Sequence, residues 1–184
     1  MPDPAHYRAG YSYLYGDVEY EHHQQVILDT IDKLTDHYGV EVKKVRWNPT
    51  STSCTAYYRD RTIGMGMTVV RHWAEHGYQE YKTLQYLLGI KQKRGEERKH
   101  SHILRDKAVQ AIVCHEYAHL VCYKMYGPVF GRGHGIMFQQ VVAEAYDLIL
   151  GADFGATERF LKKNGKKWLE QEPAFAYHAK HKGG

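Results

Sequence analysis

The sequence predicts an α+β fold, with a small antiparallel sheet between an N-terminal helix and a pair of C-terminal helices. Apolar residues recur at three- and four-residue steps near both ends of the chain, which is typical of helices. Between residues 40 and 69 they alternate in short stretches, which is typical of strands. With 184 residues, 43% of them hydrophobic, the chain suits one folded domain over residues 1–184 and excludes a disordered polypeptide.

The first element is a helix predicted over Glu19–Tyr38. Ile27, Ile31 and Leu34 fall on one face at helical spacing. Gly39 follows the last residue, and glycine readily adopts the left-handed conformation that commonly ends a helix. We therefore expect this helix to pack one apolar face on the core.

Three strands are predicted next, from the period-two alternation of apolar residues. They cover Val40–Trp47, with a bulge near its centre, then Cys54–Tyr58 and Ile63–Val69. Short turns around Asn48–Ser51 and Asp60–Arg61 join them, so we expect an antiparallel sheet. Glycines on one face of the last strand indicate the close approach of another backbone.

A helix predicted over Tyr81–Leu88 is followed by a basic segment that has the character of an insertion, at about residues 89–107. Between Lys91 and Lys107, seven lysines and arginines stand against three acidic residues, a local excess of four positive charges. Such a segment is either a solvated loop or a patch that binds polyanions, and both interpretations stay open. The residues predicted to contact nucleic acid are Lys91, Lys93, Arg94, Arg98 and Lys99.

The C-terminal half is predicted to be mostly helical. A helix capped by Asp106 runs to Tyr126, where a Gly-Pro pair stops it. A glycine-rich loop over 127–135 leads to a second helix, closed by Gly151, with Phe138 and Ile149 among the residues of its apolar face. A short amphipathic helix follows over Thr157–Lys163. The sequence closes with a short basic, aromatic tail for which no structure is predicted.

The long C-terminal helix carries the motif His115-Glu116-Tyr117-Ala118-His119. Residues four apart lie on the same face of a helix, so both imidazoles can bind one cation, for which zinc is the expected metal. Glu116 lies one step round the helix, where its carboxylate can act as the general base that takes a proton from the attacking water. The apolar residues around the motif favour a buried metal site over a chance pair of surface histidines.

A third protein ligand is expected downstream, because hydrolytic zinc sites usually have three protein ligands and one open position. His134 is the leading candidate, since it follows His119 after fourteen residues and a glycine-rich loop that lets the chain turn back. Glu144 competes with it, because some zinc peptidases use a glutamate on a downstream helix. Its alternative role is that of an ordinary polar residue on the helix surface.

The motif and the later stretch His134-Gly135-Ile136-Met137-Phe138 together resemble the SprT-like family of metallopeptidases, which includes the DNA-associated protease Spartan. The resemblance is strong over residues 115–138 and weaker over about 20–151. It implies a compact zincin-like core, one zinc ion per chain on His115, His119 and His134, and Glu116 as general base. It also implies a zinc-dependent endopeptidase with a protein or peptide substrate and single-stranded DNA as a second partner.

The chain departs from that family in two respects. Its three cysteines are too few for the four-cysteine zinc ribbon that many members carry, and the stretch between Val69 and His115 is long. Two other functions therefore stay open: a zinc-containing module that binds DNA or protein without hydrolysis, and a repressor-cleaving peptidase with Glu144 as third ligand. For a peptidase, we expect an extended substrate to pair with an exposed edge of the strand Ile63–Val69.

Three observations predict a cytoplasmic protein without a membrane partner. The first residues lack the basic and apolar regions of a secretory signal, and no apolar run approaches the ~18 residues of a membrane helix. The cysteines also lack paired C-x-x-C spacing, so we expect reduced thiols.

Overall fold

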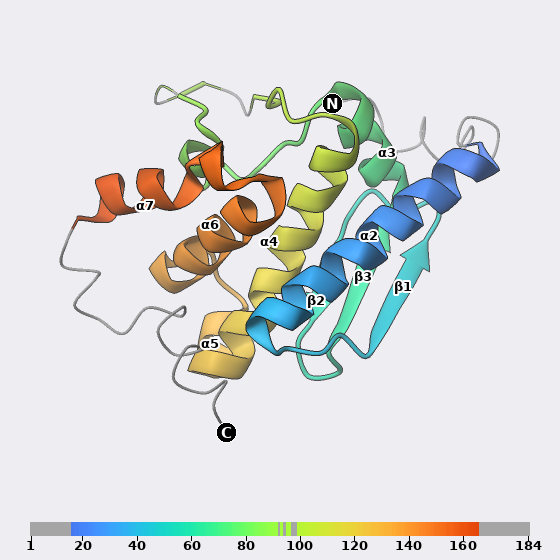
Figure 1. The fold of residues 1–184 in the computed structure, drawn as a ribbon, viewed down its shortest axis with the longest axis horizontal. Helices are drawn as coiled ribbons and strands as arrows, with labels where there is room; N and C mark the ends of the chain where they lie inside the picture. Colours follow the sequence, from blue (N-terminus) through green and yellow to red (C-terminus); the bar gives the residue numbers. More distant parts are fainter. Residues whose placement is uncertain (1–15, 92, 94, 97–98, 166–184) are drawn as a thin grey trace.

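The computed structural model describes residues 16–165, except 92, 94, 97 and 98, and it confirms the α+β fold class. The basic C-terminal tail lies outside the described residues. Helices form most of the structure, and three short strands form one sheet (Figure 1). The elements are α2 (Asp17–Tyr38), β1 (Lys44–Asn48), β2 (Thr55–Tyr57), β3 (Thr62–Gly66), α3 (Met67–His76), η1 (Gln85–Leu88), α4 (Arg105–Tyr126), α5 (Pro128–Gly131), α6 (Ile136–Leu150), η2 (Ala152–Phe154) and α7 (Ala156–Asn164).

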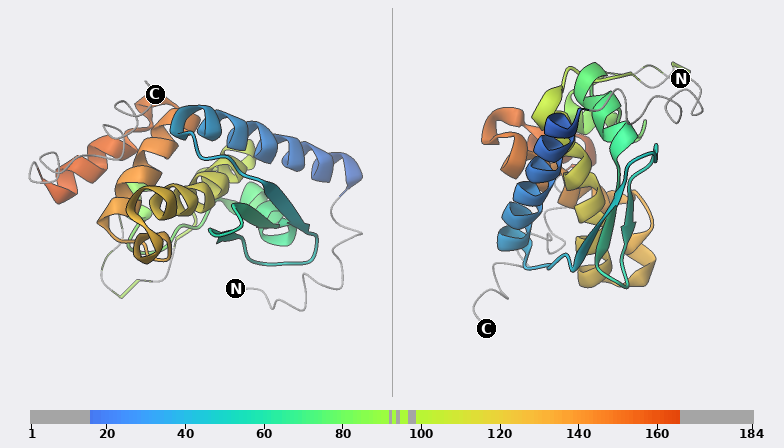
Figure 2. Two further views of the ribbon diagram at one scale, coloured as in Figure 1. Left: turned by 90° about the horizontal axis from the view of Figure 1, so that it is seen from below. Right: turned by 90° about the vertical axis from the view of Figure 1, so that its right-hand side faces the viewer.

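Helix α4 forms the centre of the molecule. It runs between α6 and α7 on one side and the sheet on the other, and α2 crosses it (Figures 1 and 2). Every residue from Ala111 to Cys122 is buried, because apolar residues occur all round this part of the helix. No helix of the described part of the chain is long and apolar enough to span a membrane.

Helix α2 confirms the first predicted helix and ends where the sequence indicates. Gly39 adopts a left-handed conformation with φ of 67°, and its N–H donates to the carbonyl oxygen of Thr35. Ile27 and Leu34 are buried in the core beside α4. The Tyr117 hydroxyl of α4 donates to the carbonyl oxygen of Val40 at 2.5 Å, which fixes the chain just after α2.

The sheet is mixed, so the prediction of an antiparallel sheet is wrong for one of its two pairings. The strand order is β1-β3-β2. Strand β3 pairs antiparallel with β2 but parallel with β1, with Lys44 opposite Thr62 and Asn48 opposite Gly66. The alternation of apolar residues specifies which face of a strand is buried, but it does not specify the neighbouring strand.

The central position of β3 also contradicts the expectation that the strand Ile63–Val69 offers an exposed edge. All five residues of β3 are buried, and the strand ends at Gly66. Helix α3 then begins at Met67, where the sequence predicts further strand, and Met67, Val70 and Ala74 are buried at helical spacing. Only the last part of the helix predicted over Tyr81–Leu88 is helical, as the 3-10 helix η1, and residues 82–84 before it form turns.

Gly66 shows which backbone approaches the glycine face of β3. A Cβ atom added there would lie 2.8 Å from the carbonyl oxygen of Ser51 and closer still to that of Ser53, so the turn before β2 of this same chain fills the space.

We predict that Gly66→Ala lowers the free energy of unfolding by about 1–3 kcal/mol, the usual cost of overpacking. Urea unfolding measures this effect. Gly16→Ala is the control, because a Cβ there meets nothing, and equal effects of both changes would contradict the prediction.

The C-terminal helices follow the predicted order. Helix α6 begins at Ile136, two residues after His134, and α7 follows it closely. The carboxylate of Asp147 accepts hydrogen bonds from the N–H groups of Ala156 and Thr157 at 2.8 Å, which holds α7 against α6. The predicted loop over 127–135 contains the short helix α5, which approaches α4 closely at Gly131.

Candidate metal centre

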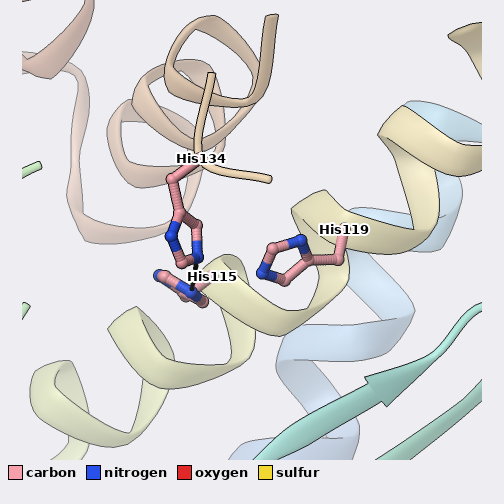
Figure 3. Close-up of side chains that lie close together, drawn as sticks. All are labelled: His115, His119 and His134. Carbon is pink, nitrogen blue, oxygen red and sulfur yellow. Dashed lines mark hydrogen bonds between the residues drawn. The ribbon is translucent and has the colours of Figure 1, made fainter. Parts of the chain in front are cut away.

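Two imidazoles of the site come from successive turns of α4. His115 and His119 are four residues apart, so they project from the same face of the helix (Figure 3). Both are buried, and their ring centroids lie 5.2 Å apart. The rigidity of a buried helix therefore sets their spacing.

The loop between α5 and α6 supplies the third imidazole. The Nε2 atoms of His115 and His134 lie 3.1 Å apart, and the rings of His119 and His134 are separated by 5.0 Å (Figure 3). One nitrogen from each of the three rings lies within 4.8 Å of the others. The structure thus brings together the three histidines that the sequence singles out, at a spacing that can hold one metal ion.

The nitrogens that face away from this point have hydrogen-bond partners. Nδ1 of His119 lies 2.8 Å from the carbonyl oxygen of Gly131, and Nδ1 of His115 lies 3.1 Å from Oε2 of Glu80. Both partners are acceptors, so each Nδ1 carries a proton, and in the neutral ring the Nε2 lone pair is then left for a cation. Imidazole nitrogens suit zinc and several other transition metals, so the donor set fits a metal ion.

The protonation of His119 also suits metal binding. Burial lowers the pKa of this imidazole, the neighbouring His115 and His134 lower it further, and the result is about 3. His119 is therefore neutral at physiological pH, and the neutral imidazole is the form that binds a cation.

Glu80 is a part of the site that the sequence does not reveal. The residue belongs to the segment that joins α3 to η1, and its side chain is fully buried. Burial alone would raise its pKa, but the charge and hydrogen bond of His115, with further hydrogen bonds from Tyr146 and the N–H of Tyr81, lower the pKa to about 2. No motif or spacing links residue 80 to residue 115, so only the folded chain brings them together.

Glu116, the predicted general base, lies on the same turn as His115 and is 9% exposed. Burial raises the pKa of its carboxyl group; the charge of His115 opposes this shift, and Glu80 adds to it. The backbone N–H of Ala56, in β2, donates a hydrogen bond to this carboxylate and favours its charged form. Strand β2 therefore passes directly beside the predicted base.

Aromatic rings surround the three imidazoles. Phe138 is buried, with its ring centroid 4.4 Å from that of His119, 4.9 Å from that of His134 and 5.1 Å from that of His115. Tyr81 lies over His134 at 4.4 Å and over His115 at 5.6 Å, and it is 45% exposed. The three imidazoles are thus bordered by the buried ring of Phe138 and by the partly exposed ring of Tyr81.

A sequence model of the SprT-like family matches residues 24–157, which is most of the chain and includes all three histidines. The chain belongs to the SprT-like family. No curated protein and no solved structure matches this SprT-like chain. The family and the three-histidine cluster together support a metal-binding, metallopeptidase-like protein.

Glu144 does not join the metal centre of this SprT-like fold. It lies on α6 with Oε1 3.2 Å from Nε2 of Gln140, and its Oε2 is buried without a hydrogen-bond donor among the described residues. The cluster of potential ligands in the described chain contains His134 instead. Burial, with a smaller contribution from Asp147, raises the pKa of Glu144 to about 7.

The raised pKa of Glu144 predicts a pH dependence of stability. The folded protein keeps a proton that the unfolded chain releases near pH 4.5, so the carboxyl group stabilises the fold below that pH and loses this effect as pH rises to about 7. At pH 8 the buried charge costs at most about 3 kcal/mol. We predict that Glu144→Gln is more stable than the parent protein at pH 8 but not at pH 5, as urea unfolding would measure. Glu158→Gln is the control, because Glu158 is exposed. The prediction would be contradicted if Glu144→Gln differed from the parent protein by the same free energy of unfolding at both pH values.

The predicted polyanion patch is only partly described. Lys91, Lys93 and Lys99 are exposed, whereas Arg94 and Arg98 lie outside the described residues. Lys99 forms an ion pair with Glu96 at 2.8 Å, and the backbone N–H of Lys93 donates to the same carboxylate. These contacts close a turn, and polyanion binding by this segment stays a prediction.

Proposed function

We propose that this SprT-like protein is a zinc-dependent endopeptidase. The observation that supports this function best is the convergence of His115, His119 and His134, with the buried carboxylate of Glu116 on the same helical turn as His115. Three imidazoles leave one position of a tetrahedral zinc site open, as hydrolytic sites require. One zinc ion per chain is expected.

Zinc in this position would polarise a peptide carbonyl and lower the pKa of a water molecule to about 7. Glu116 would accept the proton of the attacking water and then deliver it to the leaving amine. The burial that raises the pKa of Glu116 supports the first of these transfers, because a carboxylate with a higher pKa accepts a proton more readily. The hydrogen bond from Ala56 would hold the carboxylate in place between the two transfers.

Strand β2 is the edge on which we place the substrate, in place of the strand Ile63–Val69. Among the described strands, β2 has only β3 as a neighbour, so its other edge is open to an added strand. The contact between the Ala56 N–H and Glu116 supports this choice, because it puts that edge beside the general base. An extended peptide along β2 would carry its backbone past the metal centre.

Two tyrosines would flank such a peptide. Tyr58 follows β2 and lies 6.2 Å from His119, and its ring is stacked on Tyr123 at 5.5 Å. Tyr81 lies on the other two imidazoles and is exposed. Side chains of the substrate next to the cleaved bond would therefore meet aromatic surfaces, which favours apolar or aromatic residues there.

The test combines metal analysis with proteolysis. Protein purified without added metal is analysed for zinc and incubated with casein, a loosely folded substrate, before chelation, after chelation and after zinc is returned. We expect cleavage that chelation removes and zinc restores. Cleavage by metal-free protein, or no cleavage with zinc bound, would contradict the proposal. Parallel reactions with single-stranded DNA test whether DNA association accompanies the activity.

A further inference from the structure

Glu80 contacts His115 of the candidate metal centre, and its side chain has no exposed surface. Oε2 accepts hydrogen bonds from the hydroxyl groups of Tyr78, at 2.9 Å, and of Tyr146. Oε1 accepts the backbone N–H of Tyr81 at 2.8 Å. A buried charge is costly unless it is paired and hydrogen-bonded, and these donors together with His115 satisfy both conditions.

The donors to Glu80 come from separate parts of the fold. Tyr146 belongs to α6 and His115 to α4, while Tyr78 and Tyr81 belong to the segment between α3 and η1. That segment is itself fixed, because the N–H of Tyr78 donates to the carbonyl oxygen of Ile103 at 2.9 Å and the N–H of Ser101 donates back to Tyr78 at 3.0 Å. The carboxylate is therefore held on a rigid support behind the His115 ring.

His115 and His119 differ in the hydrogen-bond acceptor of Nδ1, the ring nitrogen that faces away from the metal position. His119 donates to a neutral carbonyl oxygen, that of Gly131, whereas His115 meets the carboxylate of Glu80. A carboxylate acceptor makes the imidazole a more basic ligand than a carbonyl does, and it also fixes the ring so that Nε2 points at the metal. Nε2 of His115 does point away from Glu80, toward His134.

We propose that Glu80 is a positioning residue of the metal centre, which fixes the ring and tautomer of His115 and strengthens the bond of this ligand to the metal. The inference rests on the metal site of the proposed function, but it does not depend on hydrolysis. A merely structural role for Glu80, as a link between α4, α6 and the segment before η1, would stabilise the fold without changing metal affinity.

The experiment measures the dissociation constant of zinc in competition with a chromogenic chelator, for the full chain. We expect Glu80→Gln to bind zinc about 10–100-fold more weakly, the usual effect of losing an outer partner of a metal ligand. The visible absorption band of the cobalt-substituted protein should also shift, because the donor strength of His115 changes. Urea unfolding of the metal-free proteins reports the structural contribution separately.

Tyr146→Phe is the matched control. It removes one hydrogen bond to Glu80 but keeps the carboxylate and its contact with His115, so we expect zinc affinity within about threefold of the parent, well short of the loss given above. If Glu80→Gln does not fold, Glu80→Asp replaces it, because this change keeps the charge but withdraws it from His115. The expected loss of zinc affinity is then the same in direction.

Two results would overturn the inference. One is a folded Glu80→Gln or Glu80→Asp protein that binds zinc as tightly as the parent. The other is an equal loss of affinity in Tyr146→Phe, which would indicate general support of the fold. A parent protein that does not bind zinc at all would instead contradict the proposed function, so the two failures are distinguishable.

Discussion

Glu116→Gln should abolish hydrolysis while the metal stays bound. The amide has nearly the shape of the carboxylate, and its oxygen can still accept the hydrogen bond from the Ala56 N–H, so the fold and the three histidines should be unchanged. It cannot accept the proton of the attacking water. We therefore expect the rate of casein cleavage to fall by at least ~100-fold, the lower range for loss of a general base.

The measurement compares turnover and zinc content in the same preparations. A fall of ~100-fold corresponds to about 2.7 kcal/mol of transition-state stabilisation, with no loss of zinc and no change in the urea midpoint. Glu75→Gln is the control, because Glu75 is an exposed glutamate of α3 whose ion pairs are with Arg71 and His76. If Glu116→Gln kept its activity, another group would be the base; if it lost zinc, the carboxylate would be needed for the site itself.

The residues of the candidate metal centre could be predicted because their signals are local. His115, Glu116 and His119 lie within two turns of one helix, where spacing alone determines the face that each side chain occupies. His134 follows a loop in which several glycines allow the chain to return to the helix. The C-terminal end of α4 could be predicted for the same reason, since a Gly-Pro pair stops the helix after Tyr126, whereas the helix begins at Arg105 and is not capped by Asp106.

The parts that could not be predicted depend on long-range contacts. The parallel pairing of β1 with β3 depends on how the chain crosses between them, and alternation of apolar residues carries no information about direction. The same alternation extends over Met67 and Val69, although these residues begin α3. A pattern of two or three residues fits both periods, and the packing of the helix on α4 decides between them.

Glu80 illustrates the same limit at the level of function. The residue is 35 positions from His115 in sequence, and its neighbours include two tyrosines that carry no motif. An acidic residue in such a stretch is more often a solvated side chain than a buried one. Its role becomes visible only when α4, α6 and the segment before η1 are packed together.

The second large effect is expected for His134→Ala, which should bind zinc far more weakly than Glu144→Ala. His134 supplies a nitrogen 3.1 Å from that of His115, whereas Glu144 contacts Gln140 on its own helix. Loss of a direct ligand should exceed the ~10–100-fold effect of losing an outer partner, so we expect a decrease of more than ~100-fold for His134→Ala and nearly parental affinity for Glu144→Ala.

Stability in the presence of zinc gives a second measure of the same difference. A ligand that binds only the folded state stabilises it in proportion to the logarithm of its affinity, so a ~100-fold weaker site loses about 2.7 kcal/mol of metal-linked stability. Thermal unfolding with and without zinc should therefore show most of the zinc-dependent increase in Tm missing from His134→Ala and retained in Glu144→Ala. The reverse pattern would assign the third ligand to Glu144 and would favour the glutamate-liganded class of peptidase. Because the loop that carries His134 directly follows Gly131, the last residue of α5 and the hydrogen-bond acceptor of His119, the metal-free comparison is needed to separate loss of the ligand from a shift of α5.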